Sequence, residues 1–321
     1  MLSKILVLGG GQLGSRYLQG LLKHHEALRI FVLDPWQQSL NLSVQRMQEV
    51  EVQGAGHIVS FHQTSVDLPA DFDLVIVATT ADVRPDVVQQ IASRGTVRYW
   101  VLEKVLAQSE QGLQQLAASV AGASKAWVNT PRRMMPWHQE IKSKLGFGAP
   151  IAMSVAGGQW NMASNAIHLL DLLAWWSGES LVELSTELLE PDWRETKRKG
   201  CLEVSGVLEA VYSGGSTMRL RSSDDLAGQP LTMSVVGAGG LAWTIVESSG
   251  TAQRSDGMLI AGKTVPQSAL TTDLVDAILK HGNCDLPSFE ESLAMHRVLI
   301  ASLQNHRTKT QADAPLPIPI T

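Results

Sequence analysis

Cysteine is nearly missing from this sequence: Cys201 and Cys284 are the only two in 321 residues. They are too few for a disulfide framework, and no CxxC spacing offers a metal site. The 26 Lys and Arg and the 31 Asp and Glu form no long run of either sign, which argues against nucleic acid or an anionic membrane surface as the main partner. No apolar run approaches the roughly 20 residues that cross a bilayer. From these absences we expect a soluble cytoplasmic protein without a metal site.

The remaining composition is that of a globular protein, with 44% hydrophobic and 18% charged residues. A chain of this length usually forms more than one hydrophobic core, so we expect two domains. The opening MLSKILVLGGG runs into glycines and a helical pattern without a cleavage site, and we interpret it as a first strand and not as a signal peptide.

Short apolar runs alternate with helical patterns over residues 1–125. Continuous apolar runs are typical of a parallel sheet covered on both faces, and the alternation predicts an α/β, doubly wound Rossmann domain that binds a dinucleotide. The expected strands are Lys4–Leu8, Arg29–Leu33, His57–Phe61, Asp73–Ala78 and Arg98–Leu102, and the expected helices lie near 12–24, 37–48, 82–94 and 109–121.

Residues 126–321 have a different texture, in which strand follows strand with short turns between them. This pattern predicts an α+β domain with a largely antiparallel open sheet, which would bind substrate and support oligomerisation. The proline-rich tail, ADAPLPIPIT, is expected to be extended and strapped along the surface. The expected strands include Leu202–Tyr212, Ser216–Arg221, Leu231–Val236 and Ala242–Val246, and later helices are expected at about 269–281 and 288–304.

A G-x-G-x-x-G motif lies directly after the first expected strand and directly before the first expected helix. Gly9 permits a tight turn, Gly11 lets the backbone approach a pyrophosphate, and Gly14 lets helix and strand pack closely. Gln12 and Leu13 begin the helix, whose unpaired N–H groups would face the phosphates. We therefore predict that this loop binds a dinucleotide.

Asp34 ends the second expected strand about 20 residues after Gly14, the place where a carboxylate takes both hydroxyls of an adenosine ribose. The same carboxylate would repel a 2′-phosphate, and no arginine follows it in DPWQQS. This favours NAD over NADP.

A second feature is NMASNAIHLLDLLAWWSG, residues 161–178, in which His168 and Asp171 lie three residues apart among apolar residues. One interpretation is structural: Ser164 or Asn165 caps a buried helix, and neighbours satisfy the two polar groups. The other interpretation is an active site.

These stretches together resemble the glucose–fructose oxidoreductase, inositol dehydrogenase and MocA family, written Gfo/Idh/MocA. The resemblance is carried by LGGGQLG, by VATTADVRP after the fourth strand, by LEKV after the fifth and by NAIHLLDLLAWWSG, and it covers both domains. It implies a nicotinamide-dependent oxidoreductase with cofactor contacts from Thr79, Thr80 and Glu103.

The resemblance also implies a catalytic lysine and a catalytic histidine. An E-K-P triplet ends the fifth strand in the family, with its lysine beside nicotinamide and substrate, which here is Lys104, although Val105 stands in place of the proline. His168 and Asp171 match the family's H-x-x-D. The family's aspartate four residues before the histidine is replaced by Ser164, which cannot offset an imidazolium charge. Either Lys104 does more of the acid–base work, or Asp171 or another carboxylate substitutes, or redox activity is weak.

Substrate contacts are expected around the same helix. Trp160, Asn161 and Asn165 combine an aromatic face with amides, which suits a sugar ring, and Arg133 could bind a phosphate or carboxylate of the substrate. The tryptophan could equally fill an interface. Asp171 is expected to hold the helix against the nucleotide-binding domain more than to touch substrate.

Three functions remain open at this point. The first is an NAD-dependent oxidoreductase acting on a secondary hydroxyl or ketone of a sugar, sugar nucleotide or polyol. The second is an NAD-binding sensor that has lost turnover, and the third is a sugar enzyme that uses bound NAD without net redox change. A homo-oligomer, dimer or tetramer, is also expected, because alternating strands such as VLEAVYSGGSTMRLR would otherwise expose an apolar patch.

Overall fold

The fold was obtained as a computed structural model, which describes residues 2–50, 56–146, 148–311 and 317–321. The chain divides into two compact units. The first comprises Met1–Ala107, Gln111–Asn129 and Val265–Phe289, and the second comprises Gln108–Glu110, Thr130–Thr264 and Glu290–Thr321. The expected boundary after residue 125 lies close to Asn129, but the first unit also takes in a segment from the end of the chain. Within the described ranges no helix is long and apolar enough to cross a membrane.

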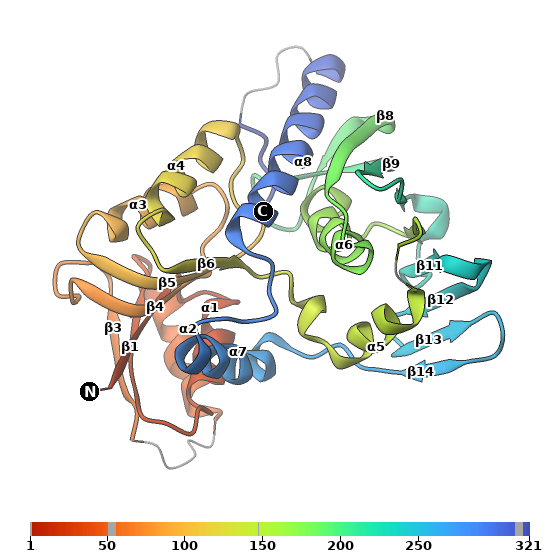
Figure 1. Cartoon of the computed structure of the whole chain (residues 1–321). Helices are drawn as coiled ribbons and strands as arrows, with labels where there is room; N and C mark the ends of the chain where they lie inside the picture. Colours follow the sequence, from red (N-terminus) through yellow and green to blue (C-terminus); the bar gives the residue numbers. More distant parts are fainter. Residues whose placement is uncertain (1, 51–55, 147, 312–316) are drawn as a thin grey trace. The chain divides into compact units, whose positions relative to one another are not determined.

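The first unit is built on a parallel six-stranded sheet in the order β3-β2-β1-β4-β5-β6 (Figure 1). Its central strands are buried over most of their length, as continuous apolar runs predict, and Ile5, Leu6 and Val7 are wholly inaccessible to solvent. This is the doubly wound sheet expected from the sequence. Its elements are β1 Ser3–Leu8, α1 Gly14–Leu21, β2 Leu28–Leu33, α2 Gln37–Gln48, β3 Ile58–His62, β4 Asp71–Val77, α3 Arg84–Ala92, β5 Thr96–Leu102, α4 Glu110–Val120 and β6 Lys125–Val128.

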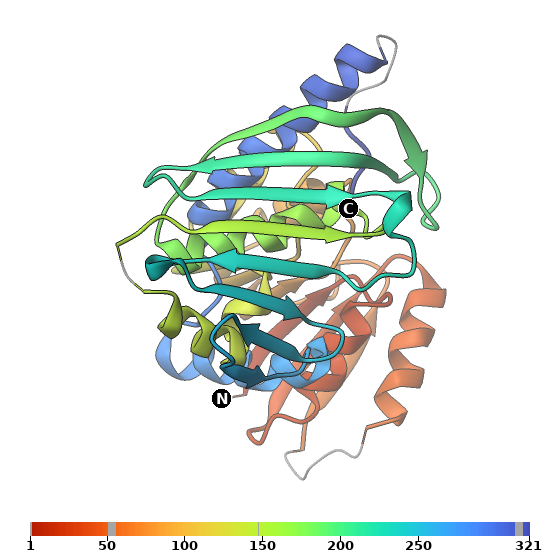
Figure 2. The ribbon, with the colours of Figure 1, turned by 90° about the vertical axis from the view of Figure 1, so that its right-hand side faces the viewer.

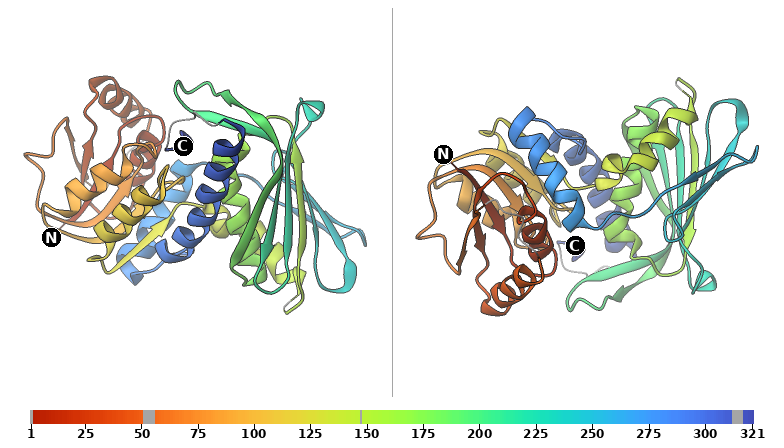
Figure 3. Two further views of the ribbon diagram at one scale, coloured as in Figure 1. Left: turned by 90° about the horizontal axis from the view of Figure 1, so that it is seen from above. Right: turned by 90° about the horizontal axis from the view of Figure 1, so that it is seen from below.

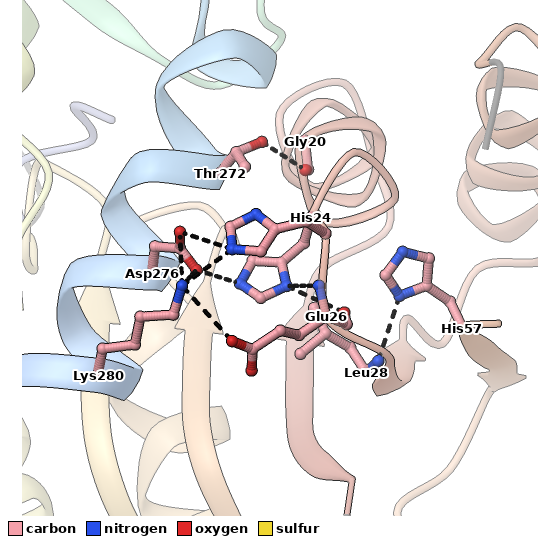
Figure 4. Close-up of polar contacts among 9 residues, drawn as sticks. Gly20, His24, Glu26, Leu28, His57, Thr272, Asp276 and Lys280 are labelled. Atoms are coloured by element: carbon pink, nitrogen blue, oxygen red, sulfur yellow. Dashed lines mark hydrogen bonds and ion pairs between the residues drawn. The ribbon is translucent and has the colours of Figure 1, made fainter. Parts of the chain in front are cut away.

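The segment that returns to the first unit carries α7, Gln267–His281, which packs against α1. The two helices approach so closely that a Cβ atom built on Gly20 would lie 2.5 Å from Cβ of Thr271. Thr272 donates a hydrogen bond to the carbonyl oxygen of Gly20 (2.9 Å), and His24 Nε2 lies 2.6 Å from Asp276 Oδ1 (Figure 4). Close backbone approach, a hydrogen bond and the contact between His24 and Asp276 thus hold α7 to the rest of the first unit.

The second unit contains an eight-stranded sheet in the order β14-β13-β12-β11-β7-β10-β9-β8 (Figure 2). All neighbouring strands run antiparallel except β7 and β10, which confirms the largely antiparallel sheet. Its strands are β7 Ala152–Gly157, β8 Leu181–Glu195, β9 Leu202–Tyr212, β10 Thr217–Ser222, β11 Thr232–Val236, β12 Ala242–Val246, β13 Thr251–Arg254 and β14 Leu259–Ala261.

One face of this sheet is covered by helices of the second unit (Figure 3). Leu208, Ala210 and Leu220 point to the covered face and are buried, and the hydroxyl of Tyr212 donates to the carbonyl oxygen of Leu170 (3.0 Å). The covering elements are the short 3-10 helix η1 Pro131–Met134, α5 Pro136–Leu145, α6 Met162–Ser177 and α8 Phe289–Thr310.

The opposite face of the sheet is turned toward the viewer in Figure 2. The exposed residues at its centre are mostly small or polar, such as Ser154, Arg219, Ser234 and Thr244. The apolar residues of VLEAVYSGGSTMRLR mostly lie on the covered face, although Val211 is exposed. The oligomer that we expected from an apolar patch therefore stays a prediction.

The described end of the tail is bound to the second unit by backbone hydrogen bonds. Ile318 N–H donates to Gln108 (3.2 Å), and Leu202 N–H donates to Pro319 (2.8 Å). Ile318 and Ile320 are fully buried, so this part of the tail contributes to the core as well as lying along the unit.

Two basic groups hold the loop after β12 by converging on Glu247. Arg132 binds both carboxylate oxygens at 2.7 Å, and Nε2 of the buried His138 lies 2.9 Å from Oε1. Burial raises the pKa of Glu247, but the charge of Arg132 and the hydrogen bonds from His138 and Arg132 outweigh it and hold the pKa far below its ordinary value. The ionised form is thus favoured in the folded state.

The depressed pKa of Glu247 predicts a pH dependence of stability. The ion pair contributes fully above the ordinary glutamate pKa, near 4.3, and the contribution is lost as pH falls below it toward the folded-state value. We expect Glu247→Gln to lose about 2–3 kcal/mol at pH 7 and less at pH 4, measured by urea unfolding. Glu190→Gln, at an exposed position of β8, is the control. An equal loss at both pH values would contradict this account.

Candidate functional site

The glycine loop between β1 and α1 has the geometry that its three glycines predict. Gly9 has φ of 93°, which favours glycine, and a Cβ atom on Gly14 would lie 1.7 Å from the carbonyl oxygen of Gly9. A Cβ atom on Gly11, in contrast, would meet no heavy atom within 4 Å. Leu13, at the N-cap of α1, makes no capping bond with its side chain. The loop therefore has open space at Gly11 next to a helix N-terminus, which suits a pyrophosphate.

Asp34 braces this loop from the end of β2. Its Oδ2 accepts a hydrogen bond from Gly10 N–H (2.8 Å), and its Oδ1 accepts one from Trp36 N–H (2.9 Å). A carboxylate oxygen accepts more than one hydrogen bond, so these contacts leave capacity for ribose hydroxyls. The Trp36 side chain beside it is 73% exposed. Main-chain N–H groups of Gly10, in the glycine loop, and of Trp36 thus fix the position of the Asp34 carboxylate.

Arg84, which begins α3, ties together the loops after β4 and β5. Its buried guanidinium donates to the carbonyl oxygens of Thr79, Val105 and Leu106. Burial lowers the pKa of Arg84 to about 10, which still leaves it charged at neutral pH. Arg84 was not singled out in the sequence analysis. Its only signal in the sequence was its position directly before Pro85, at the start of a helix. It holds the two loops that carry Thr79, Thr80 and Lys104.

Thr79 offers a polar atom that points to a ligand. Its Oγ1 is buried and has no hydrogen-bond partner among the residues that the structure describes. Buried hydroxyls are normally paired, so an orphaned one at the carboxyl edge of a parallel sheet suits contact with a bound cofactor. Together with the space at Gly11 and the carboxylate of Asp34, it fits a dinucleotide.

Glu103 and Lys104 follow β5, and the structure gives Glu103 a buried position. Its Oε1 accepts from the hydroxyl of Tyr17 (2.5 Å) and from Nδ2 of Asn129 (2.6 Å). Burial raises the pKa of Glu103, while the bonds from Tyr17 and Asn129 lower it. Through these contacts Glu103 links the end of β5 to Tyr17 of α1 and to Asn129. Its predicted contact with the cofactor stays a prediction. Lys104 is half-buried, and the peptide bond between Lys104 and Val105 is cis.

Two of the predicted site residues, Asn165 and His168, lie one turn apart on one face of α6, and Asn161 directly precedes the helix. All three are at least partly exposed, whereas the helix is otherwise largely buried. Trp160 lies just before them, where its Nε1 donates to the carbonyl oxygen of Arg221 (2.9 Å) and its own carbonyl accepts from Asn165 Nδ2 (2.9 Å). The four residues therefore form one local surface of the second unit.

The cap expected for this helix is wrong. The helix begins at Met162, before both Ser164 and Asn165, and its N-cap residue Asn161 has a left-handed backbone (φ 57°) and makes no capping bond with its side chain. Glu203, from β9, binds the first turn instead, accepting from Ala163 N–H (2.7 Å) and Ser164 N–H (3.1 Å). The Ser164 hydroxyl also donates to Glu203. This distant glutamate had no sequence signal that linked it to the helix.

Asp171, which lies among apolar residues of α6, is paired with Arg133. Arg133 binds it through Nε (3.0 Å) and NH2 (2.6 Å), and Thr130 Oγ1 donates to it (2.8 Å). Asp171 is fully buried, and Arg133 is 7% exposed. Asp171 therefore has a structural role, in which the pair fastens η1 to α6 within the second unit, whereas we expected it to hold the helix against the first domain. The same pair occupies most of the Arg133 guanidinium, and the predicted role of Arg133 in binding substrate stays a prediction.

We expect a large loss of stability when only one partner of the Asp171–Arg133 pair is removed. Asp171→Leu leaves a buried guanidinium without its carboxylate, which we expect to cost about 3–5 kcal/mol in urea unfolding. In the double variant Arg133→Met, Asp171→Leu, no unpaired charge remains, and the loss is expected to be clearly smaller than for the single change. A double variant at least as unstable as Asp171→Leu would contradict this view of the pair.

Within the described residues, no group of three or more His, Cys, Asp or Glu side chains is arranged to hold a metal ion.

Comparison with known proteins finds likeness in structure and none in sequence. No model of a protein family matches the sequence, and no curated protein matches it either. Among solved structures, UDP-N-acetylglucosamine 3-dehydrogenase GnnA from Acidithiobacillus ferrooxidans is similar, with TM-score 0.69 and 16% identity over 95% of this chain and 96% of that one. The myo-inositol dehydrogenase from Lactobacillus casei, in complex with NAD(H) and myo-inositol, has TM-score 0.68 and 17% identity over 98% and 96%.

A third similar structure is not a dehydrogenase by its description. The transcriptional regulator Gal80p from Kluyveromyces lactis has TM-score 0.71 and 12% identity, covering 96% of this chain and 90% of that one. The chain thus has the fold of this group, a Rossmann unit followed by a mixed-sheet unit. The expected resemblance to Gfo/Idh/MocA dehydrogenases is confirmed at the level of the fold.

Proposed function

We propose that the protein is an NAD-dependent oxidoreductase that transfers hydride between nicotinamide and a secondary hydroxyl or ketone of a sugar, sugar nucleotide or polyol. The glycine loop carries the proposal, because Gly14 has no room for a side chain whereas Gly11 faces open space. A loop that needed only a tight turn would not require that space. The similarity in fold to NAD(H)-bound inositol dehydrogenase supports the same function.

The cofactor would be held by Gly9, Gly11, Gln12, Leu13 and Gly14 at its phosphates and by Asp34 at the adenosine ribose. Thr79, Thr80 and Glu103 would border its other half, with the buried Thr79 hydroxyl the most direct candidate. A carboxylate at Asp34 repels a 2′-phosphate, so we propose NAD over NADP. When bound, the nicotinamide supplies the hydride acceptor or donor.

Lys104 and His168 are the proposed acid–base residues. Oxidation of a secondary alcohol removes a hydride from carbon and a proton from the hydroxyl, and the proton must pass to the protein or to water. An imidazole takes this proton near neutral pH, and an ammonium group stabilises the developing alkoxide. The proposal requires both side chains to reach one substrate when it is bound.

The substrate would meet Trp160, Asn161 and Asn165 on the surface at the start of α6. An indole face packs against the C–H groups of a sugar ring, and amides bind its hydroxyls. Arg133 would add an anion contact only through the part of its guanidinium that Asp171 does not bind. A homo-oligomer and a cytoplasmic location complete the proposal.

The test begins with the purified protein, gently denatured, and asks by absorbance and mass spectrometry whether NAD(H) is released. The NAD⁺-loaded protein is then given a panel of sugars, sugar nucleotides and polyols while absorbance near 340 nm is followed. Reduction by one of them supports the proposal and identifies the substrate class. Binding of NAD without reduction by any member of a broad panel would refute it.

A regulatory function is the second candidate, and the similarity in fold to Gal80p favours it. In that case NAD would bind tightly without turnover, and a protein partner would bind differently to the free and NAD-loaded forms. Pull-down with both forms, followed by a measurement of NAD affinity with and without the captured partner, tests it. Since coupling is reciprocal, the partner must change NAD affinity by the factor by which NAD changes partner affinity.

A further inference from the structure

Helix α2 binds the glycine loop at two of its main-chain carbonyl groups. The hydroxyl of Ser43 donates to the carbonyl oxygen of Gly10 (2.7 Å), and NH1 of Arg46 donates to the carbonyl oxygen of Gln12 (2.6 Å). Ser43 and Arg46 lie three residues apart on α2 and therefore on one face of the helix. One face of α2 thus fixes two peptide groups of the loop within the first unit.

These two contacts also set the direction of N–H groups in the loop. The Gly10–Gly11 and Gln12–Leu13 peptide bonds are trans, and in a planar trans peptide the carbonyl and the N–H point in opposite directions. Because both carbonyl oxygens face α2, the N–H groups of Gly11 and Leu13 point away from α2. Neither of them donates a hydrogen bond to any residue in the described part of the chain. Two main-chain donors are therefore left for a ligand beside the open space at Gly11.

Arg46 also brings a positive charge to the loop. Its NH1 donates to the hydroxyl of Ser15 (2.6 Å), and its NH2 donates to the side-chain oxygen of Gln12. These acceptors are neutral, and Arg46 forms no ion pair with the residues that the structure describes. Burial lowers the pKa of Arg46, the charge of Arg16 lowers it further, and Glu49 acts in the opposite direction. An anion at the loop would offset the charge of Arg46 and the partial positive charge of the helix N-terminus.

We infer that Ser43 and Arg46 position the N–H groups of the glycine loop for the pyrophosphate of the dinucleotide, and that the Arg46 guanidinium adds attraction for this anion. Both are positioning residues, because they act through peptide groups of the loop. The G-x-G-x-x-G motif does not include them, since they reach the loop from 33 and 34 residues further along the chain. The inference rests on the proposed binding of NAD at this loop.

The test compares three ligands that share an adenosine group, namely NAD⁺, ADP-ribose and adenosine. Adenosine has no phosphate, so its affinity reports on the ribose and base contacts alone. We expect Arg46→Met to weaken the binding of NAD⁺ and ADP-ribose by about 10- to 100-fold and that of adenosine by less than about twofold. Ser43→Ala removes one neutral hydrogen bond and should weaken ADP-ribose binding about fivefold. Calorimetric titration measures each affinity.

Two matched controls and one conservative variant accompany these changes. Arg29→Met removes the same charge at the start of β2, the end of the strand opposite to Asp34. Ser93→Ala removes a hydroxyl that donates to a main-chain carbonyl oxygen at the end of α3. Both controls should leave all three affinities unchanged. Arg46→Lys keeps the charge and should weaken ADP-ribose binding by no more than about fivefold.

The amide NMR signals of Gly11 and Leu13 report the direction of the two N–H groups. ADP-ribose should shift both signals downfield in the unmodified protein, because each N–H gains a charged acceptor. In Ser43→Ala the shift of the Gly11 signal should shrink, and in Arg46→Met that of the Leu13 signal should shrink. A general loss of loop structure would instead change both signals alike in both variants, before any ligand is added.

The outcomes separate this inference from the proposed function. Tight binding of NAD⁺ to Arg46→Met, or an equal loss for adenosine and ADP-ribose, overturns the inference and leaves the proposed function standing. An unmodified protein that binds neither NAD⁺ nor ADP-ribose refutes the proposed function and this inference with it. If Arg46→Met does not fold, Ser43→Ala decides, and an unchanged ratio of its affinities for ADP-ribose and adenosine overturns the inference.

Discussion

His168→Asn is expected to lower kcat by about 100- to 10 000-fold for any substrate that the unmodified protein oxidises, because the hydroxyl proton loses its acceptor. Lys104→Met should cause a loss of similar size through the developing alkoxide. Neither change should alter the affinity for NAD⁺ by more than about twofold, since neither residue is proposed to bind the phosphates or the adenosine ribose.

Steady-state kinetics with the substrate found in the panel, together with calorimetric titration of NAD⁺, measures both quantities. His281→Asn, at the exposed end of α7, and Lys23→Met, after α1, are controls of the same residue types. If His168→Asn keeps more than about a tenth of kcat, the proton leaves by another route, and His168 loses its assigned role.

Gly14→Ala and Gly11→Ala separate the structural demands of the loop from those of the ligand. Alanine at position 14 would place Cβ 1.7 Å from the carbonyl oxygen of Gly9, so β1 and α1 must move apart. We expect a loss of about 3 kcal/mol or more in stability and no measurable NAD binding. Alanine at position 11 meets nothing within 4 Å, so stability should change by less than about 1 kcal/mol.

The informative quantity is the NAD affinity of Gly11→Ala. If the pyrophosphate packs against the backbone of Gly11, one methyl group there should weaken NAD binding at least tenfold in a protein of unchanged stability. Urea unfolding and NAD titration on the same preparation give both values. Unchanged affinity would show that the open space at Gly11 is not used by the cofactor.

The sheet of the first unit could be predicted because each of its central strands is a continuous apolar run. β2, β5 and their neighbours begin or end within two residues of expectation, and α2 has the expected bounds. The exception is β6, only four residues long, whose sequence KAWV lies at the expected domain boundary and carries no periodicity. A short edge strand is specified by its pairing with β5, which no local pattern records.

The sheet of the second unit was predicted less completely. β9 and β12 have the expected bounds, because both alternate and are flanked by turn residues. β8 was missed, since over its 15 residues charged and apolar residues do not alternate strictly and its pairing with β9 is interrupted by three register shifts. β13 and β14 are short and largely exposed, which leaves little hydrophobic signal.

The candidate site shows the same division between local and distant determinants. Gly9, Gly14 and Asp34 form a local motif, and the structure gives the two glycines the predicted backbone roles, while the ribose contact of Asp34 stays a prediction. Glu203 reaches Ser164 from 39 residues away, and Arg84 reaches Val105 from 21, so neither contact leaves a spacing in the sequence. Such partners become visible only when the fold brings their strands and helices together.

The return of α7 to the first unit sets the order in which this protein can be completed during synthesis. A ribosome releases the glycine loop and all six strands of the parallel sheet early, but α1 lacks its covering helix until residues 265–289 have emerged. By then most of the second unit, up to Thr264, has already been made. The nascent first unit therefore keeps the α1 surface around Gly20 uncovered during this time, and such exposed surface is prone to association with other chains.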